Sequence, residues 1–508
     1  MKRIVLLGAL AIACAALSRD AGAGTPSLEA ARARALTVGL DLDAARGVLA
    51  KADGNDPEVA LERARLAIYE GDCDGAAVVL ADPRVAKLDQ DESRGDGLAD
   101  IARDCARATA ATLVVEDKAH DVVIRFQDDA DQALMPLLVD TIVKARAQLT
   151  RDLGVDWPKP TRVVVVRDLL GLSAMTGLPY ASASTTGTVG IAKWGRVTLL
   201  SPRASEHGYA WRDTLAHELT HLAVTHASGD RAPLWLQEGI AKREETRWRA
   251  PDPFDDRPTP ESVVAYGIQR HLDLRLDKLG PSIAMLPSAD QAMVAFAEVT
   301  SFLRYMWHEA GDAAMQQLLA KLRAGTKIDV AMTEATGADL AGWDVKWRAH
   351  LATLSEKPPA VLLAGEEKDA AAMREKIRLA ELLLGRGHGP EAASELDAVG
   401  GALLGDPHVR YLKARALEKP SARGAAADPA NDDARHVLGD PSEVFTAYAP
   451  WWAIRGRLAT DGSSATDYAE AIAQDPFDVD AACEGGAKDA DPLCRAARAS
   501  GAPEIGRE

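Results

Sequence analysis

The spacing of apolar residues changes along the chain and divides it into parts. Residues 24–111 are rich in Ala, Arg and Leu, and Leu61, Ala64 and Ile68 recur at three- and four-residue steps. That period places them on one face of a helix, so this part is predicted to be all-helical. Beyond residue 112 the apolar runs are short and β-branched, which predicts strands at 120–127, 162–167, 185–191 and 197–200.

Helical spacing returns between and after these strands. The predicted helices are 135–153, the segment around 214–226, a helix that starts near Trp235, and 263–279, 291–310 and 313–323. Because strands come first and most helices follow, residues 112–356 are expected to form one α+β domain.

The remainder of the chain is again helical in its spacing. Residues 357–420 predict helical hairpins, residues 421–435 are rich in Ala, Asp and Pro and predict a linker, and residues 436–508 carry another helix-turn-helix pattern. The helical parts on both sides resemble tetratricopeptide-like repeats, which implies a protein partner. The expected fold is therefore multidomain, with a central α+β domain flanked by all-α helical-repeat domains.

The composition is that of a folded, acidic protein. A chain of 508 residues with 47% hydrophobic and 27% charged residues is long enough for about three globular domains. The formal net charge of -17 argues against a nucleic-acid or anionic-lipid partner, because like charges repel.

The first residues have the pattern of an export signal. Two basic residues precede an apolar run at residues 4–17 that is too short to span a bilayer, so residues 1–23 are predicted to be a signal peptide. Cys14 follows Ala11-Ile12-Ala13 in a sequence that resembles a bacterial lipobox, which implies lipidation of Cys14. Cleavage near residues 21–23 is the alternative. We expect export to a bacterial cell envelope with membrane contact only through the lipid anchor, or secretion.

The other cysteines agree with export. An even number remains once Cys14 is set aside, which suits two disulfides in an oxidising compartment. Of the three connectivities, local pairing is favoured, and four buried free thiols are the alternative. The favoured pairs are Cys73 with Cys105 and Cys483 with Cys494.

The segment TLAHELTHLAVTH carries the candidate chemistry. His217, Glu218 and His221 fit the pattern H-E-x-x-H, which on a helix places both imidazoles on one face with the Glu beside them. Zinc suits imidazole and carboxylate ligands and activates a water molecule, and Glu218 would take the proton of that water. An apolar stripe gives the same helix a face for the core: Leu215, Leu219 and Leu222.

A catalytic zinc site needs a third protein ligand. His226 is one residue short of the metzincin position, and on a continuing helix it points away from the two histidines. Glu238 lies in PLWLQEGIAKREE, where a second helix after a short loop can bring a carboxylate beside the first. Gly239 allows that helix to approach closely. Glu238 is therefore the expected ligand, and an exposed Glu on a helix surface is the alternative.

The sequence HELTHLAVTHASGDRAPLWLQEGIAKREE is similar to the gluzincin-type, peptidase MA-like metalloproteases of bacteria. The resemblance covers about residues 115–355, from VVIRFQDDA and RVVVVRD to FAEVTSFLRYMWHEAG, LLAKLRAG and WDVKWRAHL. It implies a zincin-like fold, a zinc ion bound by His217, His221 and Glu238, and Glu218 as general base and acid. Phe296 stands where many members carry Tyr.

The expected function is zinc-dependent hydrolysis of peptide bonds in a peptide or protein substrate. Four residues are available to stabilise an oxyanion, although a structural role is favoured for each of them: Tyr266, His271, Tyr305 and His308. The strand at 188–191 or the one at 197–200 is a candidate to pair with an extended substrate. A repeat-based scaffold or peptide-binding lipoprotein with an inactive zincin domain is the alternative; an intact Glu218 argues against it, because pure binding has no use for a general base.

Overall fold

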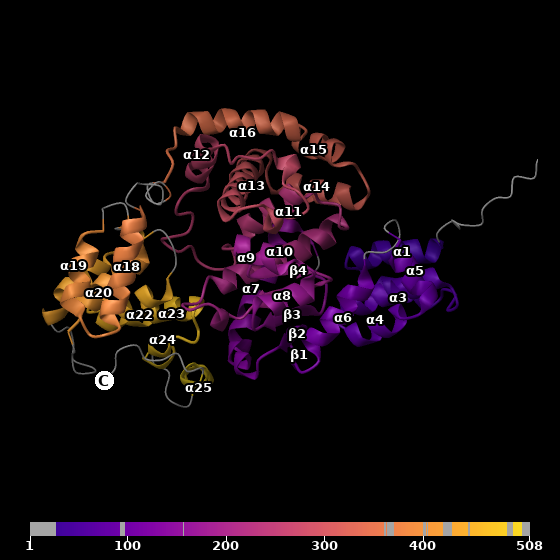
Figure 1. The fold of residues 1–508 in the computed structure, drawn as a ribbon. Coiled ribbons are helices and arrows are strands. Elements are labelled where there is room, and N and C mark those ends of the chain that lie inside the picture. Colours follow the sequence, from indigo (N-terminus) through magenta and orange to yellow (C-terminus); the bar gives the residue numbers. More distant parts are fainter. Residues whose placement is uncertain are drawn as a thin grey trace, which may run out of the picture.

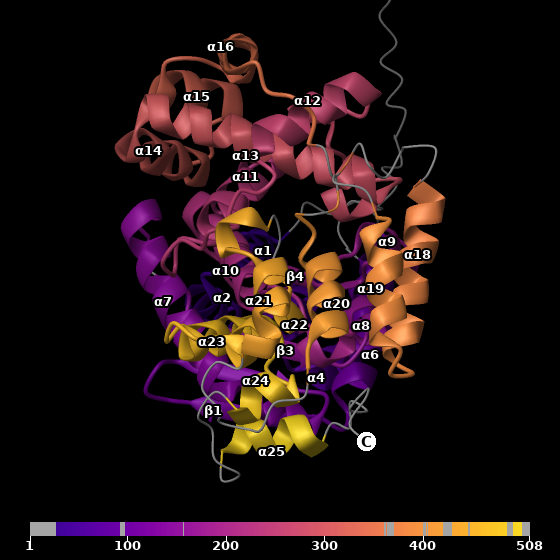
Figure 2. The same cartoon turned by 90° about the vertical axis from the view of Figure 1, so that its left-hand side faces the viewer.

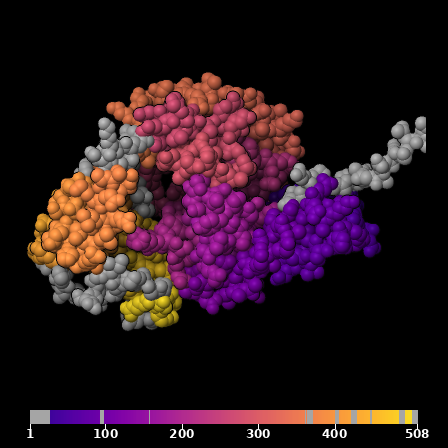
Figure 3. Space-filling view, viewed as in Figure 1, coloured from indigo at the N-terminus to yellow at the C-terminus, as the bar shows by residue number. Residues whose placement is uncertain are grey.

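Helices surround one small sheet, with the N-terminal helices on one flank and the C-terminal helices on the other (Figures 1 and 3). The computed structural model describes residues 27–91, 97–155, 157–359, 362, 370–399, 403, 405–419, 429–444, 448–484 and 491–499.

The described sheet has five strands in the order β1-β2-β3-β5-β4. Its inner pairs are parallel and its outer pairs are antiparallel, with Val163 opposite Val197 and Ile191 opposite Thr198. β4 is therefore an edge strand, whereas β5 lies between two neighbours. The strands are β1 (Leu113–Asp117), β2 (Val122–Phe126), β3 (Thr161–Val166), β4 (Gly190–Lys193) and β5 (Arg196–Leu200).

One face of the sheet packs on the helices that follow β2 and β5. Val163 and Val165 of β3 point to this face and join the main core with residues of α7 (Met135–Leu153) and α10 (Trp211–Ser228). Because side chains alternate along a strand, Val164 points the other way. The fully buried stripe of α10, which includes Leu215 and Leu219, is the apolar face that its sequence predicted.

The opposite face is covered by α8 (Leu169–Thr176) and by the N-terminal helices. Val164 shares a buried cluster with Leu172 and with the cysteines of one disulfide, Cys73–Cys105. The fully buried guanidinium of Arg196 donates to the carbonyl of Ile68 at 2.6 Å. The N-terminal helices thus complete the core beneath the sheet.

The N-terminal helices begin where the sequence supplies caps. Asp56 and Asp82 each accept a hydrogen bond from the backbone two residues on, and each is followed by a Pro at the first helical position. The helices are α1 (Leu28–Val38), α2 (Leu42–Leu49), α3 (Pro57–Glu70), α4 (Cys73–Leu80), α5 (Pro83–Asp89) and α6 (Leu98–Thr109).

A layer of helices covers the other side of α10. α11 packs on α13, and Gly239 makes this possible, because a Cβ there would lie 2.9 Å from Leu303 Cβ. The helices of the central region that remain are α9 (Tyr180–Thr186), α11 (Leu234–Glu244), α12 (Pro260–Arg270), α13 (Ala289–Ala310), α14 (Asp312–Arg323), α15 (Ile328–Thr336) and α16 (Leu340–Leu354).

The C-terminal helices, which face the viewer in Figure 2, have buried clusters of their own. Trp451 and Ile454 lie at the centre of one cluster and Leu396 and Leu412 in another. Their resemblance to tetratricopeptide repeats stays a prediction. The helices are α18 (Ala370–Leu384), α19 (Gly389–Asp397), α20 (Pro407–Leu417), α21 (Asp432–Leu438), α22 (Ala449–Leu458), α23 (Ser464–Gln474), α24 (Val479–Glu484) and α25 (Pro492–Ala499). Nowhere in the described ranges is a helix both long and apolar enough to cross a membrane.

Several sequence-based assignments need correction. The predicted strand at 185–191 begins only at Gly190, because Thr186 ends α9 and its hydroxyl donates to the carbonyl of Ser182. The predicted helix at 263–279 ends at Arg270, where His271 adopts a left-handed backbone conformation with φ 55°. Two further differences concern β1, which was not predicted, and the end of the expected linker, where residues 432–435 begin α21.

Candidate active site

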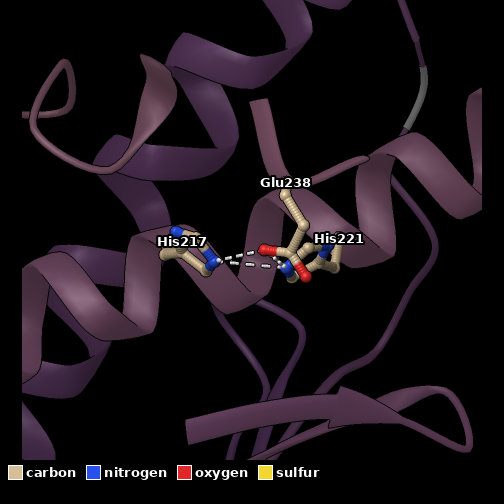
Figure 4. Close-up of side chains that lie close together, drawn as sticks. All are labelled: His217, His221 and Glu238. Atoms are coloured by element: carbon tan, nitrogen blue, oxygen red, sulfur yellow. Dashed lines mark hydrogen bonds and ion pairs between the residues drawn. The ribbon is translucent and has the colours of Figure 1, made fainter. Parts of the chain in front are cut away.

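Two consecutive helices, α10 and α11, bring the predicted ligands together. His217 and His221 lie one turn apart on α10, which ends at Gly229 in a left-handed conformation. The chain then turns back into α11, which carries Glu238. Figure 4 shows the two imidazoles and the carboxylate pointing toward one another.

The distances within this group match those expected of zinc ligands. The Nε2 atoms of His217 and His221 are 3.2 Å apart, and each is 3.5 Å from an oxygen of Glu238. A tetrahedral zinc with ligand bonds of about 2.0–2.1 Å separates its ligand atoms by about 3.3 Å. Among the residues that the structure describes, it is the only group of three or more His, Cys, Asp or Glu side chains whose ligand atoms lie close enough together to hold one ion. The site therefore fits a zinc ion.

An outer carboxylate, Glu245, fixes the orientation of His217. Its Oε2 lies 3.2 Å from His217 Nδ1, so the imidazole donates from Nδ1 and presents the lone pair of Nε2 to the ligand group. Lys242 holds the other oxygen of Glu245 at 2.5 Å. The sequence analysis missed Glu245. Its spacing of seven residues from Glu238, two helical turns, was the available signal.

The carboxylates make the site strongly attractive to a cation. Burial acts to lower the pKa of His217, but Glu238 and Glu245 outweigh it and raise that pKa to about 10. Burial acts to raise the carboxylate pKa values, yet the histidines hold the pKa of Glu238 well below its usual range, and Lys242 with His217 holds that of Glu245 at about 2. A divalent ion would occupy the place of the proton that His217 otherwise retains.

Glu218 belongs to α10, and its side chain lies between this helix and the edge strand β4. Gly190 of β4 allows the close approach, because a Cβ there would lie 3.0 Å from Glu218 Cγ and 2.8 Å from Thr214 Cγ2. The backbone N–H of Ala192 donates to the carboxylate. Burial raises the pKa of Glu218, while the two neighbouring histidines oppose that rise. The carboxyl is thus poised to accept and release a proton.

A cleft of about 770 Å³ contains these residues. One face of α10 forms its floor, with Thr214, Glu218, His221 and Thr225 at three- and four-residue steps. β4, α11 and Phe296 form further walls, and the ring of Phe296 lies 6.3 Å from that of His217. Residues of α1 and α3 also line the cleft.

The other histidine and tyrosine candidates lie elsewhere. His226 Nδ1 is 3.2 Å from the carbonyl oxygen of Gly39, so it faces the N-terminal helices. None of the four oxyanion candidates lines the cleft in the part of the chain described: Tyr266 is buried, His271 ends α12, Tyr305 stacks on His350 and His308 lines a separate cavity. Their positions agree with the structural roles that were favoured for each of them.

The structure also pairs the cysteines locally. Cys73 and Cys105 are bonded, with Cα atoms 5.8 Å apart, and so are Cys483 and Cys494, at 4.8 Å. Cys14 and the rest of the expected signal peptide, residues 1–23, lie outside the described residues.

Comparison with known families bears on the region that carries this geometry. Residues 141–353 match the model of the Peptidase MA superfamily. The match covers less than half of the chain and includes α10, α11 and the helices through α16, but neither flank. No curated protein matches the chain. The central region is therefore peptidase MA-like, which supports a metallopeptidase.

Proposed function

We propose that this protein is a zinc-dependent peptidase of the gluzincin type. The observation that carries the proposal is the spacing of His217, His221 and Glu238, whose ligand atoms are 3.2–3.5 Å apart beside Glu218 in an open cleft. The Peptidase MA match over the same residues supports it. A scaffold or a peptide-binding protein would have no use for Glu218 as a general base.

The residues around the site have distinct tasks in peptide hydrolysis. A bound zinc ion supplies Lewis-acid activation of water and of the scissile carbonyl. His217, His221 and Glu238 would hold the ion, and Glu245 keeps His217 in the tautomer that can bind it. The carboxylate of Glu218 takes a proton from the attacking water and delivers it to the leaving amine nitrogen. Phe296 keeps one side of the site dry.

β4 is the element against which an extended substrate would lie. As an edge strand that lines the cleft it can add a further strand, unlike β5, whose partners are β3 and β4. Residues 197–200, the other candidate strand for substrate pairing, are therefore excluded. Protection of the β4 amides from hydrogen exchange by a bound peptide would support this placement, and unchanged exchange would refute it.

We further propose that the chain is exported in a bacterium and anchored by Cys14, with secretion as the alternative. The signal-like pattern at residues 1–23 supports this, and so do two disulfides, which suit an oxidising compartment. A protein partner is proposed to bind the C-terminal helices. Labelling with radioactive palmitate, lost in Cys14→Ser, is the expected outcome; labelling that persists would refute the anchor.

Metal content tests the proposal most directly. The purified chain should bind about one zinc, Glu218→Gln should keep it, and Glu238→Gln should lose or greatly weaken it. Glu245→Gln is the matched control: it leaves the ligands in place and should weaken zinc binding by about 10- to 100-fold. Peptide hydrolysis should fall at least about 100-fold in Glu218→Gln. A chain that binds no zinc, or a Glu218→Gln variant as active as wild type, would refute the proposal.

A further inference from the structure

One wall of the catalytic cleft comes from outside the matched family region. Val38 is the last residue of α1, Leu40 follows that helix, and Tyr69 belongs to α3. All three line the same cleft as Glu218. They precede residue 141, where the family match begins. These three residues therefore lie outside the region that the family match covers.

Trp194 joins this wall from the turn between β4 and β5. Its backbone is left-handed, with φ 55°, a conformation that is unusual for a bulky residue and is kept where the surroundings impose it. The ring is fixed on its edge by Tyr69, at 5.9 Å between centroids, and Lys193 Nζ lies 4.9 Å from the ring centroid. The two-residue hairpin between β4 and β5 imposes this conformation, because such a turn requires positive φ at both of its residues, here Trp194 and Gly195.

The indole N–H of Trp194 lacks an acceptor. Only 8% of Trp194 is exposed, and its Nε1 has no hydrogen-bond partner among the residues described. A buried donor without an acceptor costs about 1–3 kcal/mol. Trp194 lines the cleft, but its Nε1 atom is itself covered, so the carbonyl of a bound peptide would reach it only once a neighbouring side chain moves.

The geometry of α10 gives the position of this wall along a substrate. Thr225 lines the cleft four residues beyond His221, and the next residue, His226, contacts Gly39, between Val38 and Leu40. Four residues of helix span about 6 Å. An extended peptide advances about 3.3 Å per residue, so for a peptide that runs along α10 the wall lies about two substrate residues from the metal ligands.

We propose that Trp194 and the neighbouring apolar side chains form a subsite for a large apolar side chain of the peptide substrate, about two residues from the scissile bond. The wall consists of Val38, Leu40, Tyr69, Trp194, Leu222 and Leu234, contributed by the N-terminal helices, the β-turn, α10 and α11. The subsite rests on the proposed peptidase function and adds its specificity. Continuity with the cleft that holds Glu218 identifies the occupant as substrate.

The charged residues near this wall suggest a preference for an acidic substrate side chain instead. The test must distinguish that preference from an apolar one. Arg34, Arg65 and Lys193 line the cleft here, and Asp230 does so too. Arg65 is buried against Glu62 at 2.7 Å, and Lys193 donates to the carbonyl of Thr176 at 3.0 Å. Their interactions with the protein lead us to expect that the apolar wall, and not these cations, selects the substrate.

Val38→Trp is the decisive variant, because Val38 is half-buried at the end of α1 and a larger ring there fills the subsite. Val78→Trp is the matched control: Val78 is 76% exposed on α4 and is not among the residues that line the cleft. Trp194→Phe keeps an aromatic ring and removes the N–H. All are compared on peptides that differ at one position, carrying Leu, Phe, Ala, Glu or Lys.

Two readouts separate this subsite from the proposed activity. Hydrolysis by the zinc-loaded chain gives kcat/KM, and binding of the same peptides in a Glu218→Gln background gives affinity without turnover. We expect wild type and Val78→Trp to favour Leu and Phe over Ala by about tenfold or more, Val38→Trp to lose that preference, and Trp194→Phe to bind about two- to tenfold more weakly.

The outcomes distinguish the two proposals. Apolar selectivity in binding without any hydrolysis would keep the subsite and refute the peptidase. Hydrolysis with no preference, with a preference for Glu, or with the same preference in Val38→Trp as in wild type would refute the subsite and leave the peptidase standing.

Discussion

The N-terminal helices bury many side chains in the core of the central region, beside one small cluster of their own, whereas the C-terminal helices bury theirs mainly in their own clusters and contribute Phe477 to the main core. Cys73 and Cys105 lie in one cluster with Val164 of the sheet, and Arg196 of β5 reaches into the N-terminal helices to bind the carbonyl of Ile68. The C-terminal cluster around Trp451 has one partly buried residue of the central region packed against it, Phe254.

The two flanks also differ in their relation to the cleft. Tyr69 and Leu40 line it, while no C-terminal residue is among the described residues that do. The two flanks have a similar helical spacing of apolar residues in the sequence, but they differ in how they pack on the central region. The N-terminal helices help to form the cleft, whereas the C-terminal helices do not contribute to its described lining, which is why the partner is proposed to bind there.

Removing each disulfide should break the comparison most visibly. By loop-closure entropy, the Cys73–Cys105 bond, which closes 32 residues, contributes about 4 kcal/mol, and the Cys483–Cys494 bond, which closes 11, about 3 kcal/mol. Replacing the first pair by Ser should lower the temperature at which activity is lost. Replacing the second pair should lower the temperature of a separate unfolding transition and leave the temperature at which activity is lost unchanged. Equal effects on activity would mean that the flanks are coupled alike.

The buried arginine at the N-terminal interface offers a smaller perturbation. Arg196→Met removes one of the donors to the Ile68 carbonyl, which keeps its hydrogen bond from the Gly71 N–H, and should cost about 1 kcal/mol, seen as loss of activity at lower urea concentration. Arg457→Met is the C-terminal counterpart, since Arg457 pairs with Glu418 and Asp480 there. It should leave the urea dependence of activity unchanged, and a shift as large as that of Arg196→Met would contradict the distinction.

A rise in pH should weaken the packing of the C-terminal side. Burial, reinforced by Asp478, raises the pKa of Asp475 to about 7, next to Gly208 of the central region. A raised carboxyl pKa favours the protonated form in the folded state, so its stabilisation is fully present below the ordinary pKa and is lost as pH rises through about 7. Burial lowers the pKa of Arg196 only to about 10, so the N-terminal contact keeps its charge.

Thermal unfolding followed by tryptophan fluorescence at pH 5 and pH 8 measures this difference. The unfolding temperature of the C-terminal transition should be lower at pH 8 than at pH 5. This decrease should be smaller in Asp475→Asn, which cannot ionise. A C-terminal transition with the same pH dependence in wild type and Asp475→Asn would remove Asp475 from the argument.

The sequence predicts what local spacing determines. The helix at 135–153 has those bounds in the structure, because Gly154 follows it in a left-handed conformation. The spacing of His217 and His221 places them one turn apart wherever the helix lies, so the ligand pair could be named from the sequence. The end of α12 could not, because a His in the left-handed conformation is a weaker stop signal than Gly.

Contacts between distant segments are what the sequence could not supply. Tyr69 and Trp194 are separated by more than a hundred residues, and no periodicity in either segment indicates that they meet. The same holds for the four oxyanion candidates, which have suitable chemistry but lie away from the cleft. Residue type predicts which chemistry a side chain can perform, and the tertiary fold decides whether it can reach the substrate.

The smallest predicted effect compares two similar aromatic contacts, one at each flank. Tyr69 meets Trp194 of the central region at 5.9 Å, and Phe254 of the central region meets Trp452 at 6.0 Å, both edge-to-face. Such pairs contribute about 0.5–1.5 kcal/mol beyond burial, so Tyr69→Leu and Phe254→Leu should destabilise their interfaces by similar amounts. Only Tyr69 lines the cleft. Tyr69→Leu should therefore change peptide selectivity several-fold at temperatures where both variants are folded, while Phe254→Leu should stay within about twofold of wild type. If both variants changed selectivity equally, the effect would reflect general loosening, and the wall would lose its special position in the cleft.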